Sequence, residues 1–397
     1  MDIDLGCDRA VLDPAGYFAE ARAGGAVQWS AHQRGWVVLS HAEVEAAFRD
    51  GTTLSSDRTG PLNRAAAQRS PAFQRVVELL SGWMNFRDPP VHTRLREPVH
   101  RAFTPRAVAL LEPEVRSIVA TVIDGFDSDV VDLGRAFARP IPALVIAAML
   151  GVDPADRPRL QDWSDDLAKI VFAISPGAPD EAPIVEATEE FTAFFSGLIE
   201  RERIHPTGTL LTAVVQESSG DLSAMELVGA CTLLLFGGHE TTTTALINAI
   251  GTLIARPDLM AWLRDHPEHD ATAVDEFLRV GAPGRTMVRK VAGDHARGGK
   301  PLKQGQNVFL SIAAANHDDA VFAHPGRVDL TRQPNPHLGF GWGLHYCLGA
   351  TLARMEMRVA LRTLLDRYPR LAAEGTIIPL RGNALGFGRR PLLARLR

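Results

Sequence analysis

Residues 339–354 read GFGWGLHYCLGATLAR, and this stretch decides the fold. Glycines are dense before its single cysteine, Cys347. After the cysteine, the apolar residues Leu352, Met355 and Val359 recur at helical spacing, and no proline or glycine interrupts them. The stretch therefore predicts a glycine-rich loop that presents one cysteine and passes at once into a helix.

A cysteine at the start of a helix favours the thiolate form, because the helix dipole and the unpaired backbone N–H groups stabilise negative charge. Glycines allow the backbone to lie flat against a large ligand. Three simpler interpretations stay open: a buried structural cysteine, a phosphate-binding glycine loop, and a nucleophilic cysteine with His345 as its base. No Lys-Ser/Thr pair closes a phosphate loop here, and residues two apart in a loop rarely form a nucleophile–base pair.

The order Phe-Gly-x-Gly-x-His-x-Cys-x-Gly in this loop resembles the heme-binding loop of the cytochrome P450 family, in the pattern of its soluble bacterial members. The resemblance implies that the chain binds heme b (iron protoporphyrin IX), with Cys347 as the axial ligand of the iron. In that family the thiolate pushes electron density toward cleavage of the O–O bond. The resemblance also implies heme contacts for Phe340 and for His345, the latter as a propionate donor.

Composition and charge fit an ordinary globular protein. The 397 residues are 46% hydrophobic and 22% charged, and a net charge of −5 argues against a nucleic-acid-binding protein. Three widely spaced cysteines indicate neither a disulfide framework nor a cysteine metal cluster, which fits a reducing compartment. The polar N-terminus lacks a signal-peptide pattern, and the longest apolar run, residues 141–152, is too short to span a bilayer. We therefore expect a cytoplasmic protein without a membrane anchor.

A second motif lies at residues 85–96, which read NFRDPPVHTRLR. Proline suits the first turn of a helix, and the helix that follows places His92 and Arg96 four residues apart on one face. Both side chains can donate hydrogen bonds to an anion, although a solvated basic face is the simpler interpretation. The string resembles the P450 helix whose histidine and arginine hold a heme propionate, and this implies the same role for His92 and Arg96.

The third motif interrupts an apolar helix that the sequence predicts over residues 222–255. Its middle reads GGHETTTT from Gly237 onward, and glycines, an acid and hydroxyls are poor choices for a buried helix. Residues that do not favour the structure in which they lie often indicate a functional site. The segment resembles the P450 oxygen-binding groove, which implies that Gly237 and Gly238 open space beside the iron. It also implies that Thr241 hydrogen-bonds the oxygen and that Glu240 relays protons for O–O cleavage.

Glu276 and Arg279 lie three residues apart on one side of a predicted helix. A routine surface pair is the simpler interpretation. The spacing matches the Glu-x-x-Arg of the P450 family, which implies a buried pair that braces the heme-side core as a folding device. Further along, Arg289 matches a second propionate-binding arginine of that family.

The four motifs resemble the P450 family over nearly the whole chain. The resemblance implies the P450 fold, mainly α-helical with a small β-rich lobe. We expect a single domain over residues 1–397, with the β-rich lobe at roughly 20–60 plus 285–312 and the helical lobe in the remainder. The sequence also predicts a strand over 308–314 and an irregular loop over 52–68.

We expect a lipophilic small-molecule substrate, a natural product or its precursor. Leu233, Phe236 and Met287 are the candidates for apolar contact with it. Gly284 stands where many P450s have a branched residue that narrows the space above the heme. Arg285 has the charge to clamp a carboxylate, but we expect it to face elsewhere.

The resemblance implies a monooxygenase that inserts one atom of O2 into a C–H bond or oxidises a π system. The chain is too short for a fused reductase domain, so we expect a monomer that takes electrons from an acidic ferredoxin and its reductase. Arg96, Arg101, Arg354 and Arg358 are expected to form the positive surface for that ferredoxin. Three alternatives remain: a peroxygenase driven by H2O2, a non-catalytic heme binder or sensor, and a cysteine hydrolase. The acid–threonine pair of the central helix argues against the peroxygenase.

Overall fold

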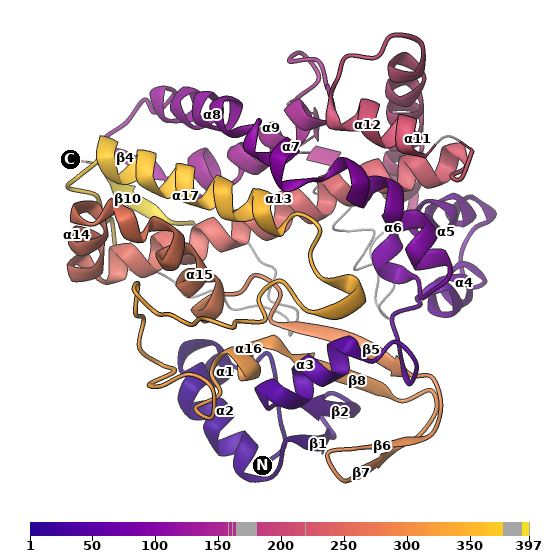
Figure 1. The fold of residues 1–397 in the computed structure, drawn as a ribbon, viewed down its shortest axis with the longest axis horizontal. Coiled ribbons are helices and arrows are strands. Elements are labelled where there is room, and N and C mark those ends of the chain that lie inside the picture. The colour runs from indigo at the N-terminus through magenta and orange to yellow at the C-terminus, as the bar shows by residue number, and fades with distance from the viewer. Residues whose placement is uncertain (158, 161, 164–180, 219, 376–390, 397) are drawn as a thin grey trace. The chain divides into compact units, whose positions relative to one another are not determined.

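The computed structural model describes residues 1–157, 159–160, 162–163, 181–218, 220–375 and 391–396. This part of the chain is mainly helical with small sheets, as the sequence predicts (Figure 1). Residue contacts divide the chain into two compact units. Unit 1 comprises Met1–Ser55, Val115–Ile141 and Thr241–Arg397, and unit 2 comprises Ser56–Glu114 and Pro142–Glu240.

A five-stranded sheet with the order β1-β2-β8-β5-β3 lies in unit 1. Its strands are β1 (Val27–Ser30), β2 (Gly35–Val38), β3 (Leu54–Ser55), β5 (Thr286–Val291) and β8 (Asn307–Ser311). β2 runs parallel to β8, and the other neighbouring pairs are antiparallel. Strand residues such as Val38 and Leu310 share a buried apolar core with Phe48 from a neighbouring helix. The sheet and this helix are thus held together by one apolar core.

The other elements of unit 1 surround that sheet or form a helical layer (Figure 1). They are α1 (Asp8–Leu12), α2 (Pro14–Ala23), α3 (His41–Arg49), α14 (Pro257–Asp265), α15 (Asp270–Val280), α16 (Ile312–Asn316), α17 (Ala350–Arg367), β4 (Val130–Asp132), β6 (His295–Arg297), β7 (Lys300–Leu302), β9 (Ala372–Ala373) and β10 (Leu393–Arg395). α16 packs on α2 and α3, and α15 packs on α17. α17 begins just after the cysteine loop, where the glycine-rich segment ends.

Unit 2 is built from helices. They are α4 (Thr59–Ala66), α5 (Gln74–Ser81), α6 (Val91–Ala102), α7 (Pro105–Ala109), α11 (Glu181–Ile204) and α12 (Leu210–Glu217). α11 packs on α5 and α12, and α12 packs on α6. Three further helices continue from one unit into the other: α8 (Glu112–Asp124), α9 (Pro140–Met149) and α13 (Ala224–Ala255).

The helix α13 starts close to where the sequence predicts a helix. Ser223 and Glu226 form a reciprocal cap, because the Ser223 Oγ accepts the Glu226 amide at 3.2 Å and the Glu226 carboxylate accepts the Ser223 amide at 2.9 Å. Most of the helix is buried, as its apolar composition requires. The cap therefore fixes the register of the residues that follow.

Two local predictions were wrong. The strand predicted over 308–314 ends at Ser311, because the Ser311 Oγ accepts the Ala314 amide at 3.2 Å and caps a short helix instead. The loop predicted over 52–68 contains β3 and α4. Pairing with the distant strand β5 makes residues 54–55 a strand, and composition alone does not show such a contact.

Among the described residues, none of the helices combines the length and the apolar content needed to cross a bilayer. The strands of the five-stranded sheet come from residues 27–55 and 286–311. The expected division of one domain, residues 1–397, into a β-rich and a helical lobe stays a prediction.

Candidate active site

Cys347 lies half-buried in a loop that its own backbone holds in place. The Cys347 amide donates to the Phe340 carbonyl at 3.0 Å, which closes the loop. Gly341 and Gly343 have φ angles of +67° and +70°, a region that favours glycine. A Cβ on Gly343 would also lie 2.7 Å from the carbonyl oxygen of Phe48. The glycines thus serve the turn and its close approach to α3.

Arg289 of β5 and His345 also belong to unit 1. The Arg289 guanidinium lies over the Phe48 ring, 5.8 Å from its centroid. That ring is 3.7 Å from the position of a Cβ on Gly341. Arg289 is buried and His345 is half-buried in the turn just before Cys347. The structure therefore brings both predicted propionate donors to the cysteine loop.

Glu276 and Arg279 of α15 form a fully buried ion pair, with both side chains 0% exposed. Two nitrogens of Arg279 each donate to a Glu276 oxygen at 2.8 Å. Arg279 also donates to the carbonyls of Asn316, Pro325 and Arg327 at 2.8–3.0 Å. The pair thus holds the segment that leads toward the cysteine loop, and it is no surface pair.

His92 and Arg96 lie on α6 in unit 2. The side chain of His92 is buried. Burial and then the positive charge of Arg96 lower the pKa of His92 below its ordinary value, although the charge of Asp88 acts in the opposite direction. The first turn is fixed by the His92 amide, which donates to the Asp88 carbonyl at 3.0 Å. An anion beside His92 and Arg96 would offset the repulsion between them.

One face of α13 is less covered than the rest of the helix. Leu233, Gly237 and Thr241 follow one another at intervals of four residues, and each is half-buried. The residues just after Thr241, from Thr242 to Thr244, are buried. Such a partly open stripe on a central helix is what a bound ligand would cover.

Gly237 and Gly238, which the sequence predicts to line the oxygen-binding groove, have different surroundings. A Cβ on Gly237 would meet no atom within 4 Å, so this glycine faces open space. A Cβ on Gly238 would lie 2.5 Å from the Cδ1 of Ile146, so this glycine lets α9 approach α13. The expectation that both glycines open space therefore needs correction: Gly238 serves helix packing. The neighbouring His239 is fully buried, and its Nδ1 lies 3.8 Å from a carboxylate oxygen of Glu240.

Comparisons with known proteins bear on this geometry. The cytochrome P450 family model matches residues 271–396. The chain is 36% identical over 349 residues to cytochrome P450 CYP107DY1 of Priestia megaterium, covering 85% of this chain and 84% of that protein. The chain belongs to the cytochrome P450 family. It is also 36% identical over 344 residues to mycinamicin IV hydroxylase/epoxidase of Micromonospora griseorubida, covering 85% and 83% of the two chains. The structure of the P450 CYP109B1 from Bacillus subtilis is 32% identical, with a TM-score of 0.83, and the match covers 97% of this chain and 100% of that one.

This P450 is a monooxygenase whose cofactor is heme b. Its residues fit that cofactor. Cys347 provides the soft sulfur donor that suits iron, and Arg289 adds a buried positive charge beside its loop. On α13, Gly237 leaves a space that a side chain would fill.

The structure changes the interpretation of Phe236 in this P450. Only 9% of its surface is exposed, and its ring packs on Trp83 with the centroids 5.3 Å apart. Trp83 also stacks on Phe86 and donates its indole N–H to the Thr232 hydroxyl at 3.0 Å. Phe236 is therefore mainly an anchor for the segment before α6, and at most its edge faces a substrate.

The remaining substrate candidates lie near the start of β5. Met287 is 38% exposed, and its Cε would be 3.2 Å from a Cβ on Gly284. Met287 thus lies over the room that Gly284 leaves. Arg285 points elsewhere, as expected, because it donates to the Ala10 carbonyl at 2.5 Å. Burial lowers the pKa of the Arg285 guanidinium below its ordinary value.

The sequence did not single out three residues that the structure places next to the predicted site. Trp83 packs against α13, and Asp275 and His337 lie beside the cysteine loop. Asp275 directly precedes the Glu276 of the Glu-x-x-Arg motif, which is the one sequence signal that it gave. His337 and Trp83 gave none, because the partners that tie them to the site, Asp275 and Phe236, lie far away in the chain.

Proposed function

We propose that Cys347 is the thiolate ligand of the heme iron and that this P450 inserts one atom of O2 into a C–H bond, or oxidises a π system, of a lipophilic small molecule. The proposal is carried by one observation, the closed glycine loop that holds Cys347 half-buried at the start of α17. When bound, heme b supplies the activation of dioxygen. The chain supplies the sulfur, the orientation of the cofactor and the protons.

The first experiment is spectroscopic. The reduced protein under carbon monoxide is expected to show a thiolate-type Soret band. With a ferredoxin, its reductase and NADPH, a bound substrate should then yield a product that contains one atom of isotope-labelled O2. A Soret band of any other type in the freshly purified protein would overturn the assignment of Cys347.

We propose that His92, Arg96, Arg289 and His345 hold the heme propionates. The burial of His92 beside the charge of Arg96 supports this role, because an anion there would accept a hydrogen bond from either side chain and offset their repulsion. The burial of Arg289 supports it as well, since a buried guanidinium is stabilised by a nearby anion. We also propose that Phe340 contacts the heme.

We propose that Thr241 and Glu240 deliver protons for O–O cleavage. Thr241 lies on the partly open stripe of α13, in line with Gly237. Replacing Thr241 by alanine removes a hydroxyl whose proton transfer contributes roughly 10²-fold or more to such a step. We therefore expect Thr241→Ala to divert most of the electrons from product to H2O2, as measured by the ratio of product to NADPH consumed.

The buried neighbour Thr242 provides a matched control. Thr242→Ala removes the same atoms away from the open stripe and should keep the wild-type ratio. Thr241→Ser keeps the hydroxyl and should show much of the wild-type ratio of product to NADPH consumed. Equal ratios in Thr241→Ala and Thr242→Ala would remove Thr241 from the proposed proton path.

For the substrate, we propose a lipophilic natural product or its precursor. The described residues that support apolar contact with this substrate are Leu233, Gly284 and Met287. Leu233 is half-buried on α13, and Met287 is exposed beside Gly284, which has no side chain. Relatives are named for work on such molecules, among them the mycinamicin IV hydroxylase/epoxidase and a vitamin D(3) 25-hydroxylase of Pseudonocardia autotrophica. A screen for ligands that shift the heme spin state, followed by product analysis, would identify the compound.

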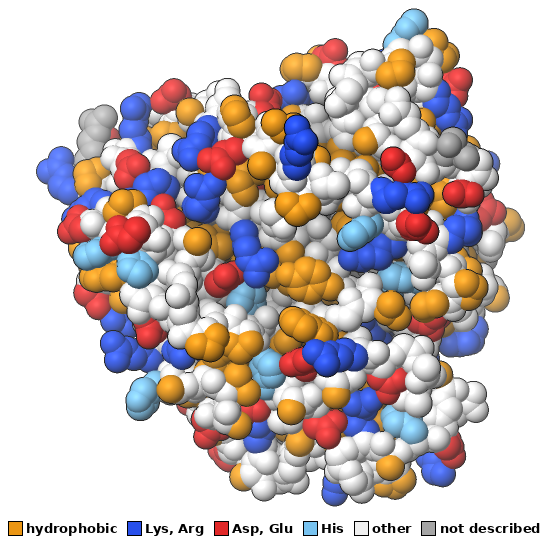
Figure 2. Space-filling view, viewed as in Figure 1, with side chains coloured by type: hydrophobic (Ala, Val, Ile, Leu, Met, Phe, Trp, Pro, Cys, Tyr) orange, Lys and Arg blue, Asp and Glu red, His pale blue; other side chains and the backbone are white. Residues whose placement is uncertain are grey.

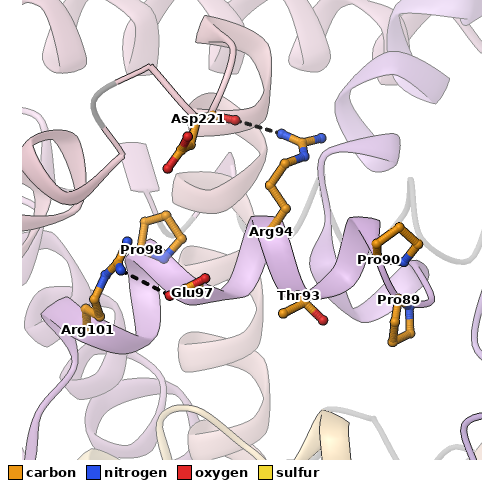
Figure 3. A pocket seen from close by; sticks show the side chains of 8 residues that line it. All are labelled: Pro89, Pro90, Thr93, Arg94, Glu97, Pro98, Arg101 and Asp221. Atoms are coloured by element: carbon orange, nitrogen blue, oxygen red, sulfur yellow. Dashed lines mark hydrogen bonds and ion pairs between the residues drawn. The ribbon is translucent and has the colours of Figure 1, made fainter.

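We propose an acidic ferredoxin and its reductase as the electron source, but the expected positive surface needs revision. Arg101 of α6 is bound by Glu97 at 3.0 Å, as Figure 3 shows. Glu217 also binds Arg101, at 2.9 Å. The Arg94 nearby is bound by Glu226 at 2.6 Å. Figure 2 shows positive and negative side chains interspersed over the visible face. The attraction for an acidic partner is therefore weaker than the number of arginines suggests.

The ion pair between Arg101 and Glu97 can be tested by neutralising each partner in turn at low ionic strength. Arg101→Gln should slow the reduction of the heme by the ferredoxin. Glu97→Gln should accelerate it, because the charge of Arg101 is then less neutralised. Stopped-flow reduction measures both rates, and the differences should vanish near 1 M salt, where screening acts over about 3 Å. Identical rates in both variants would exclude this surface from ferredoxin docking.

We also propose that the protein acts in the cytoplasm. Cys7, Cys231 and Cys347 are all described, and none of them forms a disulfide bond. That pattern supports a reducing compartment. The monomeric state stays a prediction.

A further inference from the structure

Three charged or polar side chains converge beside the cysteine loop in unit 1. The carboxylate of Asp275, on α15, accepts a hydrogen bond from the Arg354 Nε of α17 at 2.7 Å. The same carboxylate oxygen lies 3.2 Å from the Nε2 of His337. Asp275 thus joins three parts of the chain: its own helix α15, the irregular segment before the cysteine loop, and the helix α17 after that loop. We call Asp275, His337 and Arg354 the Asp275 clasp.

The histidine of the clasp connects directly to the loop backbone. The Gly339 amide donates to the His337 Nδ1 at 3.1 Å. Because that nitrogen accepts, the proton of a neutral ring is on Nε2, which then donates to Asp275. A Cβ on Gly339 would lie 3.0 Å from both the His337 Nδ1 and the Leu278 carbonyl oxygen, so any other residue would crowd this contact.

The arginine of the clasp acts on the next residue, Phe340. Its guanidinium carbon lies 4.5 Å from the centroid of the Phe340 ring, on which the His337 ring also packs at 5.8 Å. A cation over an aromatic face is attracted by the ring quadrupole. The Phe340 carbonyl in turn accepts the Cys347 amide at 3.0 Å. A continuous series of contacts therefore runs from Asp275 to the backbone of Cys347.

The charges of the clasp favour its formation. Burial alone would raise the pKa of Asp275, but hydrogen bonds from His337 and Arg354 outweigh burial and hold the pKa below its ordinary value. Burial lowers the pKa of Arg354, but the hydrogen bonds to Asp275 and Tyr346 together with the charges of these groups outweigh burial, so the pKa lies above its ordinary value. Both groups are charged near neutral pH, and the bond between them is charge-assisted.

We propose that Asp275, His337 and Arg354 are positioning residues, which fix Phe340 and thereby hold the backbone of Cys347 in the geometry that iron ligation needs. This inference rests on the proposed ligation of iron by Cys347. It gives Arg354 a partner within the enzyme's own structure, whereas the sequence analysis placed it on the positive surface for the ferredoxin. The side chain of Arg354 is 36% exposed, so part of it still reaches the surface.

The chain offers a matched control on the same two helices. Asp270 of α15 binds Arg362 of α17 through two hydrogen bonds of 2.5 and 3.0 Å. This pair also joins α15 to α17, but further hydrogen bonds of Arg362 run to the carbonyls of Arg264 and Leu263, away from the cysteine loop. Asp270→Ala therefore reports the general effect of losing such a pair, and Asp275→Ala reports the effect on the loop.

The test uses the heme-loaded enzyme and two readouts that are not turnover. The first is hydrogen exchange of the amides from Gly339 to Cys347. The second is the rate at which the ferrous carbonyl complex loses its thiolate-type Soret band, measured at the same interval below each variant's unfolding temperature. We expect Asp275→Ala to accelerate both by about tenfold, the equivalent of about 1.4 kcal/mol. Asp270→Ala should stay within about twofold of the wild type.

Two further variants keep the test decisive if Asp275→Ala folds poorly. Asp275→Asn retains an oxygen acceptor without the charge and should lie between the wild type and Asp275→Ala. Arg354→Met retains an unbranched side chain over Phe340, loses the donor and should accelerate both readouts. Equal effects of the Asp275 and Asp270 variants would overturn the clasp while the proposed function stands. A wild-type enzyme without the thiolate-type band would overturn the proposed function, and exchange at Gly339 would still decide whether the clasp holds the loop.

Discussion

Replacing Cys347 by serine is expected to abolish the thiolate-type Soret band of the ferrous carbonyl complex and to reduce product formation to background. A serine hydroxyl keeps its proton near neutral pH and lacks the electron-rich sulfur that favours O–O cleavage. The loop itself should persist, because the amide of residue 347 donates to the Phe340 carbonyl whichever side chain it carries. We therefore expect Cys347→Ser to fold, and absorption spectra of the purified variant provide the measurement.

Cys7→Ser is the matched control for this substitution. Cys7 is also half-buried, and its sulfur accepts the Ala10 amide at 3.4 Å, a role that a serine hydroxyl performs equally well. Cys231 is no competing ligand, since burial raises the pKa of its thiol to about 12. A thiolate-type band that survives in Cys347→Ser, or that disappears in Cys7→Ser, would contradict the assignment.

Replacing Arg279 by methionine should give the largest loss of stability of any substitution considered. Arg279 has no exposed surface, and it joins the Glu276 carboxylate to three backbone carbonyls between residues 316 and 327. Removing one partner of a buried ion pair costs about 3–5 kcal/mol, and here Glu276 would keep only its second cation, Arg332, at 3.1 Å. We expect a decrease of that size in the free energy of unfolding by urea, followed by loss of heme.

The Arg256–Asp258 pair of unit 1 is the control, because it is a well-formed ion pair with both side chains exposed. Arg256→Met should leave the urea midpoint unchanged within error. The double variant Glu276→Leu with Arg279→Met should recover little, since the carbonyls of Asn316, Pro325 and Arg327 stay without their donor. An Arg279→Met protein as stable as Arg256→Met would contradict the role of the buried pair as a brace.

The sequence predicted those parts of the site that depend on neighbouring residues. Ser223 caps α13 close to where the sequence predicts the start of that helix, because a cap needs a partner only three residues away. The glycine loop before Cys347 is likewise set by local backbone bonds. The sequence missed β3 and extended the strand near 308 too far, since strand pairing joins distant segments.

The roles of single side chains were harder to predict. Gly238 was expected to open space, yet Ile146 of another helix fills its surroundings. Phe236 was expected to face the substrate, yet it packs on Trp83. Arg101 was expected to form part of the positive surface for a ferredoxin, yet Glu97 and Glu217 bind it. In each case the residue type was informative, but at least one partner that fixed its role lies far away in the chain and was not visible in the sequence.

The sequence by itself determined the family, the cofactor and the candidate residues, because these depend on residue types at fixed short spacings. The tertiary structure alone decided which side chains are engaged with one another. Arg285 binds a carbonyl 275 residues away, and Arg354 binds a carboxylate 79 residues away. No local pattern encodes such contacts, since they form only when packing of the whole chain brings the two partners within hydrogen-bond distance.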